Sequence, residues 1–193
     1  MVEMEERLIA MQEFETKAAH WDHCISMLTV EGLIMEFGVF SGTSINHIAE
    51  RVAPHKVYGF DSFKGLPTRW NTVRKGYFAL PEPPKVRDNV ELVVGLFEDK
   101  LPEFLSKHSE LASLIHVDCD LYSSTKTVLD HLTPRIVPGT IIMFDELLNY
   151  GGWKLHEFKA FSEFMDASSL KYEYISSVLG DHPRPVSVRI LSA

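Results

Sequence analysis

The apolar residues of this chain fall into short runs separated by segments of helical spacing. The runs are Leu33–Phe37, Lys56–Phe60, Val90–Val94, Leu114–Val117 and Thr140–Phe144. Near-continuous apolar runs of this length are typical of strands that are buried on both faces of a parallel sheet. The sequence therefore predicts an α/β fold in which helices cover both faces of the sheet.

Helical spacing is clearest before and between these runs. From about Met4 to Leu28, apolar residues recur at helical spacing without Gly or Pro, which predicts an N-terminal helix within residues 1–30. Shorter segments with the same spacing predict further helices over residues 43–52, 101–107, 124–132 and 155–165.

The end of the chain predicts two more strands, Lys171–Ser176 and Val186–Leu191. The linker between them is too short for a crossover helix, so we expect these strands to pair antiparallel. Residues 1–193 should therefore form a single domain: a doubly wound, mostly parallel seven-stranded sheet with an antiparallel C-terminal strand. This variant suits a Rossmann-like methyltransferase fold better than a plain dinucleotide-binding fold.

Charge and composition limit the classes of partner that we expect for this chain. The chain has 19 basic and 27 acidic residues, for a net charge of −8, and no dense stripe of Lys and Arg that would follow a nucleic-acid backbone. No apolar run approaches the ~20 residues of a membrane span, and the acidic start Met1–Arg7 is unlike a signal peptide. We expect a soluble cytoplasmic protein in which Cys24 and Cys119 are reduced thiols.

Residues 65–89 differ from the rest, because they combine four prolines with aromatic and basic side chains. A long loop of this kind in a compact domain is often a lid over a binding site, although disorder is the alternative. We interpret it as a possible lid loop.

The ends of the first two strands resemble a nucleoside site. Gly38 and Gly42 form a glycine turn after the first strand, and Asp61 ends the second strand about 20 residues later. A carboxylate at this place accepts hydrogen bonds from ribose hydroxyls. Each motif alone is equally explained by a tight turn or a helix cap. Phe63 either stacks on an adenine or belongs to the core.

Acidic residues follow two further strands: Asp118 and Asp120 after the fourth, and Asp145 and Glu146 after the fifth. These strands are neighbours in the expected fold, so the carboxylates should converge, and a cluster of negative charges requires a cation or protons. Oxygen ligands of this kind suit Mg²⁺. The alternative is that each acid only caps a helix or a turn. His116 is expected to be a core residue, and His156 either enters the substrate pocket or lies on the surface.

Together these segments resemble the macrocin O-methyltransferase family of S-adenosylmethionine-dependent enzymes, which methylate sugar hydroxyls and use magnesium. The resemblance covers most of the chain and rests on residues 33–42, 59–67, 95–102 and 117–125 and on the pair Asp145 and Glu146. It implies transfer of a methyl group from S-adenosylmethionine to a hydroxyl of a small-molecule acceptor, assisted by a divalent metal. A homo-oligomer is compatible with it.

The resemblance also implies roles for single residues. Asp118, Asp145 and Glu146 match metal ligands, and Asp120 matches the general base. Contacts to the cofactor are expected from Glu36, Gly38, Phe40, Ser41, Gly42, Thr43, Ser44, Asp61, Ser62, Phe63, Gly95, Phe97 and Asp118. The chain departs from the family pattern at Glu146, where Asp is usual, and at Cys119, where Gly is usual.

Two other functions compete with methyl transfer. One is a protein that binds S-adenosylmethionine without catalytic turnover. The other is a nicotinamide-dependent oxidoreductase, which the missing G-x-G-x-x-G spacing and the carboxylate cluster weigh against.

Overall fold

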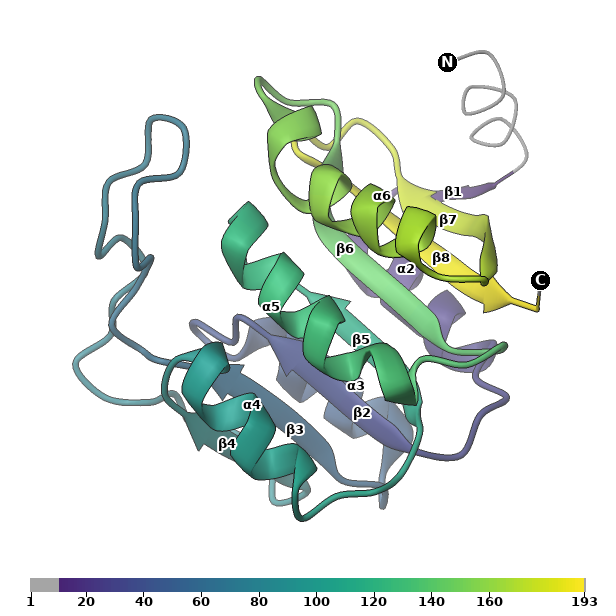
Figure 1. The fold of residues 1–193 in the computed structure, drawn as a ribbon. Coiled ribbons are helices and arrows are strands. Elements are labelled where there is room, and N and C mark those ends of the chain that lie inside the picture. Colours follow the sequence, from purple (N-terminus) through teal and green to yellow (C-terminus); the bar gives the residue numbers. More distant parts are fainter. Residues whose placement is uncertain (1–10, 193) are drawn as a thin grey trace.

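The computed structural model describes residues 11–192, which form one eight-stranded sheet with helices on both faces (Figure 1). The strand order is β1-β7-β8-β6-β5-β2-β3-β4. Strand β8 is antiparallel to both β6 and β7, and the other neighbouring strands are parallel. The strands are β1 (Gln12–Phe14), β2 (Leu33–Phe37), β3 (Val57–Asp61), β4 (Val90–Val94), β5 (Ala112–Val117), β6 (Ile141–Leu148), β7 (Lys171–Val178) and β8 (Arg184–Leu191).

The helices cover the two faces of the sheet unequally. Helices α2 and α3 lie behind the sheet in Figure 1, and α4, α5 and α6 lie in front of it. Each group packs a separate apolar cluster against the strands, as a doubly wound fold requires. The helices are α2 (Lys17–Ser26), α3 (Thr43–Val52), α4 (Phe97–Leu105), α5 (Tyr122–Leu132) and α6 (Glu157–Ala167), with single 3-10 turns η1 (Thr133–Arg135) and η2 (Trp153–Leu155). Within residues 11–192, none of these helices has the length and apolar character needed to cross a membrane.

The central strands explain the continuous apolar runs of the sequence. Every residue of β2, β5 and β6 is buried, because helices cover both faces of these strands. From β2 the chain moves to β3 and β4 on one side, and it then returns to β5 on the other side of β2. The strand order reverses there, so a crevice for a ligand opens at the carboxyl ends of β2 and β5.

The predicted N-terminal helix is wrong at its beginning. Residues 4–10 of that prediction lie outside the described part of the chain. Gln12–Phe14 form β1, which pairs in parallel with Ser176–Val178 of β7. The helix begins only at Lys17, where Thr16 caps it by accepting a hydrogen bond from the N–H of Ala19 at 3.2 Å. This added edge strand makes the described sheet eight-stranded rather than seven-stranded.

Strand β6 is longer than the sequence predicts. It continues through Leu148, with an irregular register between Phe144 and Leu148, so Asp145 and Glu146 lie within its last part rather than after it. The C-terminal prediction is confirmed, because β7 and β8 form an antiparallel pair. Both cysteines are free and buried, which agrees with the expected thiols.

One buried histidine ties helix α2 to the sheet. His20 is 1% exposed, and its Nε2 lies 2.8 Å from the hydroxyl oxygen of Ser187 on β8. Burial, followed by the charge of His116, lowers the pKa of His20 to about 4. The folded protein therefore holds this imidazole in its neutral form at neutral pH.

This histidine should make stability depend on pH. In the unfolded chain the pKa of a histidine is about 6.5, so the unfolded state gains protons before the folded state does. The contribution of neutral His20 is therefore complete above pH ~6.5 and is lost as the pH falls toward about 4, by about 3 kcal/mol in all.

We expect urea unfolding to show this loss as a difference between the wild type and His20→Gln, which keeps a polar group near Ser187. The free energy of unfolding of the wild type should decline more steeply between pH 7 and pH 4 than that of the variant. Parallel pH profiles for the two proteins would contradict the assignment.

Candidate active site

A cavity of about 530 Å³ opens at the carboxyl ends of the central strands. Its size is within the range of ligand pockets in proteins. The turn after β2, the ends of β3, β5 and β6, the starts of α4 and α5, and the loop after β3 form its walls. Most of the predicted site residues line it: Gly38, Phe40, Asp61, Ser62, Gly95, Phe97, Asp118, Asp120, Asp145 and Glu146.

The glycine turn after β2 is shaped by its contact with β5. Gly38 has a φ of +98°, and a Cβ atom there would lie 1.7 Å from the carbonyl oxygen of Asp118. The N–H of Asp118 in turn donates to the carbonyl of Phe37 at 2.9 Å. A glycine is required at this position both by the backbone angle and by the close approach of the two strand ends.

Asp61 holds the same turn from the other side. Its Oδ2 accepts hydrogen bonds from the N–H groups of Val39 and Phe40, each at 2.9 Å, and its Oδ1 accepts one from Phe63 at 2.8 Å. An ionised carboxylate has about four acceptor sites, so these bonds leave capacity for a ligand hydroxyl. Asp61 is therefore a turn residue that also faces the cavity.

Six of the predicted cofactor residues do not line the cavity: Glu36, Ser41, Gly42, Thr43, Ser44 and Phe63. Phe63 is 5% exposed and belongs to the apolar cluster beside α3. The hydroxyl of Ser44 donates to Glu36 at 3.0 Å, and Gly42 is the N-cap residue that precedes α3. These residues build the wall behind the turn, and their direct contact with a cofactor stays a prediction.

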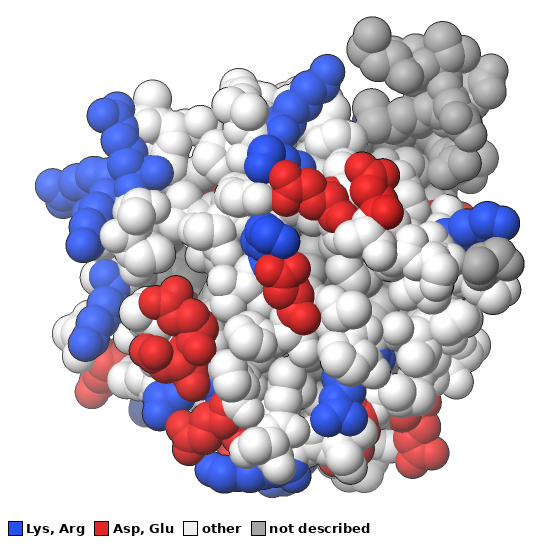
Figure 2. Space-filling view, in the orientation of Figure 1, with Lys and Arg blue, Asp and Glu red and all other residues white. Residues whose placement is uncertain are grey.

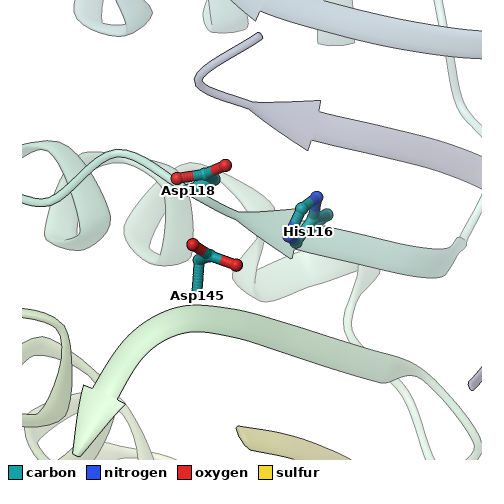
Figure 3. Close-up of side chains that lie close together, drawn as sticks. All are labelled: His116, Asp118 and Asp145. Carbon is teal, nitrogen blue, oxygen red and sulfur yellow. The ribbon is translucent and has the colours of Figure 1, made fainter. Parts of the chain in front are cut away.

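His116 joins this wall to the acidic residues. It is 1% exposed, and its Nδ1 lies 2.8 Å from Oε2 of the fully buried Glu36, which confirms it as a core histidine with a partner. Ligand atoms of His116, Asp118 and Asp145 also lie within 4.8 Å of one another (Figure 3). His116 was not predicted as a ligand from the sequence. The available signal was its spacing of two from Asp118, which puts both side chains on one side of a strand.

Asp120, Asp145 and Glu146 are buried and Asp118 is partly buried beside them, and this changes the ionisation of the cluster. Burial, followed by the charge of Asp145, raises the pKa of Asp118 well above its ordinary value and that of Asp120 to about 7. Burial, followed by the charge of Asp118, likewise raises the pKa of Glu146. A carboxyl with a pKa near 7 is suited to general base catalysis at neutral pH.

Two charged residues at this cluster were missed by the sequence analysis. Glu157 of α6 is fully buried, and its Oε2 accepts a hydrogen bond from the N–H of Glu146 at 3.1 Å. Lys17 of α2 places its Nζ 2.6 Å from Oδ2 of Asp145. Neither residue stands in a motif or near the acids in sequence, so only the fold brings them together.

The side chains present fit a divalent cation. Oxygen atoms of Asp118 and Asp145 and a ring nitrogen of His116 are grouped closely enough to share an ion. Glu146 is 8% exposed, and its Oε2 has no hydrogen-bond partner within the described residues. A buried carboxylate oxygen without a partner is costly, and an adjacent cation would remove that cost.

The loop after β3 forms one wall of the cavity. Leu66, Pro67, Thr68 and Phe78 face the cavity, and the ring of Phe78 contacts Phe40 with centroids 5.3 Å apart. The loop is held by its own backbone bonds, including Leu66 N–H to Tyr77 carbonyl at 3.0 Å. Its position is compatible with a lid, which stays a prediction.

The far part of this loop reaches the segment after β6. The ring of Trp70 lies 5.7 Å from Tyr150 and 6.3 Å from His156, centroid to centroid. His156 therefore packs against the loop and is not among the cavity-lining residues. Exposed Arg69, Arg74 and Lys75 belong to the loop, and Figure 2 shows Lys and Arg gathered at the edge where the loop projects in Figure 1.

A search of curated proteins finds a relative from Streptomyces olivaceus, the 8-demethyl-8-(2,3-dimethoxy-alpha-L-rhamnosyl)-tetracenomycin-C 4'-O-methyltransferase. It is 26% identical over 152 residues, which are 64% of this chain and 57% of that protein. The match therefore spans less than two thirds of the relative's length.

Solved structures agree with this relationship. The calicheamicin methyltransferase CalS11 superposes with a TM-score of 0.71 at 27% identity, over 89% of this chain and 77% of that chain. An O-methyltransferase from Bacillus cereus in complex with SAH gives a TM-score of 0.63 at 17% identity, over 98% and 90% of the two chains, which supports the fold.

A family model described as a methyltransferase domain matches residues 35–147, from β2 to β6. This segment is more than half of the chain, and it contains the glycine turn, Asp61 and the strand-end acids. The chain belongs to this methyltransferase domain family.

Proposed function

We propose that this protein transfers the methyl group of S-adenosylmethionine to a hydroxyl of a small molecule, of the sugar or natural-product class. One observation carries the proposal. The glycine turn with Asp61 and the acidic cluster open onto the same cavity, so a nucleoside site and a set of proton-accepting groups share one space. The named relatives act on a rhamnosyl tetracenomycin and in calicheamicin chemistry, which supports this acceptor class.

The cofactor half of the cavity is assigned to the ends of β2 and β3. Asp61 would accept hydrogen bonds from the ribose hydroxyls while it holds the backbone of Val39 and Phe40 in place. Gly38 keeps this wall free of a side chain, so that a ligand can approach the backbone. Bound S-adenosylmethionine supplies the methyl group on its sulfonium.

The acceptor half is assigned to the ends of β5 and β6. Asp120 is 7% exposed and faces the cavity, where it would take the proton of the acceptor hydroxyl. Asp118 and Asp145, with His116 or Glu146, would hold a divalent ion, and Mg²⁺ is the ion that the family resemblance implies. When bound, that ion supplies positive charge that makes a nearby hydroxyl more acidic. The remaining contribution of the protein is to orient the acceptor and exclude water.

The loop over residues 65–89 is proposed to close the acceptor side. Pro67 and Thr68 line the cavity, and Trp70 reaches the segment after β6, so the loop spans the two halves of the site. The acceptor is proposed to be a small molecule rather than nucleic acid because the chain carries a net charge of −8 and an acidic cavity.

Calorimetric titration of S-adenosylmethionine and of its demethylated product, each with and without Mg²⁺, tests the proposal. Saturable binding of both compounds followed by transfer of labelled methyl to an acceptor panel is the expected result. Binding without transfer would favour the alternative of a cofactor-binding protein without turnover. Absence of binding in all conditions would refute both.

The role of Asp61 gives a first quantitative expectation. Asp61→Asn removes the charge but keeps the shape of the side chain, and it should weaken binding of S-adenosylmethionine roughly 10- to 100-fold, the effect of losing charge-assisted hydrogen bonds. Titration calorimetry measures the change. Asp88→Asn, in an exposed segment of the chain, is the matched control and should bind like the wild type. Equal affinity for all three proteins would exclude Asp61 from the nucleoside site.

The role of Asp120 gives a second quantitative expectation. Asp120→Asn should lower kcat by about 100-fold or more, because the proton of the acceptor hydroxyl loses its acceptor. The Kd for S-adenosylmethionine should stay within a factor of about two, since the residue is assigned to the acceptor half. Asp130→Asn on α5, whose carboxylate pairs with Lys126 at 3.0 Å, serves as control. Unchanged kcat in Asp120→Asn would refute the assignment.

A further inference from the structure

The acidic cluster already contains a cation that belongs to the chain. Nζ of Lys17 lies 2.6 Å from Oδ2 of Asp145, and the two residues are 128 positions apart in sequence. Lys17 is the first residue of α2, and its side chain is 40% exposed, whereas the side chain of Asp145 is 9% exposed. The lysine therefore reaches from the edge of the cluster toward a largely buried carboxylate.

This carboxylate is one of the three groups that could share a divalent ion. Oxygen atoms of Asp145 and Asp118 and a nitrogen of His116 lie within 4.8 Å of one another. An ammonium at hydrogen-bond distance uses one oxygen of Asp145 and adds a positive charge beside the ion position. A divalent ion in the same place would be repelled by that charge.

Lys17 does not satisfy every oxygen of the acidic cluster. A lysine side chain at hydrogen-bond distance from a carboxylate is a cation at neutral pH, so Lys17 and Asp145 form an ion pair. Three further carboxylates, from Asp118, Asp120 and Glu146, face the same cavity. Oε2 of Glu146, which is 8% exposed, has no hydrogen-bond partner among the described residues, so the cluster keeps an oxygen that a cation could contact.

We propose that Lys17 is a positioning residue that competes with a divalent cation for Asp145. The ammonium holds Asp145 in place while the ion is absent, and it must release this carboxylate when the ion binds. Lys17 thereby sets how tightly the site takes up metal. The inference rests on the proposed cation site but does not depend on methyl transfer.

The location of Lys17 gives the competition a structural route. Thr16 caps the first turn of α2 through the N–H of Ala19, which fixes the backbone next to Lys17. The flexible four-carbon side chain can move away from Asp145 without disturbing this cap. Release therefore requires a side-chain rotation and not an unfolding of the helix.

The affinity for metal alone tests the proposal. Binding of Mn²⁺, measured by the electron paramagnetic resonance signal of the free ion, and of Mg²⁺, measured by calorimetry, would be compared in the wild type, Lys17→Met, Lys17→Arg and Lys126→Met. Lys126 is the matched control, because its side chain is 42% exposed and pairs with Asp130 on α5. We expect Lys17→Met to bind both ions about 10-fold more tightly or better, and the other variants to bind like the wild type.

Each other outcome overturns the proposal. Weaker binding by Lys17→Met would mean that Lys17 orients Asp145 for the ion, and unchanged binding would mean that the pair is unrelated to metal. If no protein bound metal, the cation site itself would be wrong. Titration of S-adenosylmethionine into the same samples separates these failures from a failure of the proposed function, and retained binding shows that each variant is folded.

Discussion

Burial of negative charge at the carboxyl ends of β5 and β6 is the constraint on which the arrangement of this site depends. Asp118, Asp120, Asp145 and Glu146 face one cavity, and Glu157 is buried directly behind them. Carboxylates removed from water must be protonated, hydrogen-bonded or paired with a cation. The surrounding structure provides these three kinds of compensation at different residues of the cluster. This explains why residues from distant parts of the chain meet here.

The parallel sheet is the reason that these negative charges lie close together. Parallel strands end at the same edge, so strand-end acids converge at the switch point whether or not their charges are balanced. The close contact between Gly38 and the backbone of Asp118 holds the glycine turn against the first of these acids. The glycine turn and the acidic cluster therefore share a wall, and the hydrogen bond from the N–H of Asp118 to the carbonyl of Phe37 joins the two strand ends.

Much of the fold was predictable because its signals are local. The continuous apolar runs identified the buried central strands, and the short linker identified the antiparallel pair β7 and β8. Strand β1 was not predictable, because Gln12–Phe14 have helical spacing and become a strand only by pairing with β7. Tertiary pairing overrides local preference at such a sheet edge.

The residues of the candidate site were also predictable only in part. Asp61, Asp118, Asp120 and Asp145 lie in the last part of a strand or just after it, and all of them line the cavity, as expected from their positions. Glu36, Ser44 and Phe63 belong to the same motifs but lie behind the cavity, where Glu36 accepts a hydrogen bond from the hydroxyl of Ser44 and Phe63 joins the apolar cluster beside α3. A motif thus indicates where a site is, and only side-chain direction decides which of its members face the ligand.

Two charged residues that contact the acidic cluster come from outside the segment that defines the family. That segment covers residues 35–147, whereas Lys17 precedes it and Glu157 follows it. The family segment supplies the crevice, the turn and the strand-end acids, and the flanking helices supply an ammonium and a further carboxyl from opposite faces of the sheet (Figure 1). Since a charge of either sign at this distance changes how readily the acids accept protons or ions, α2 and α6 can alter the ionisation of the acids that the family segment supplies.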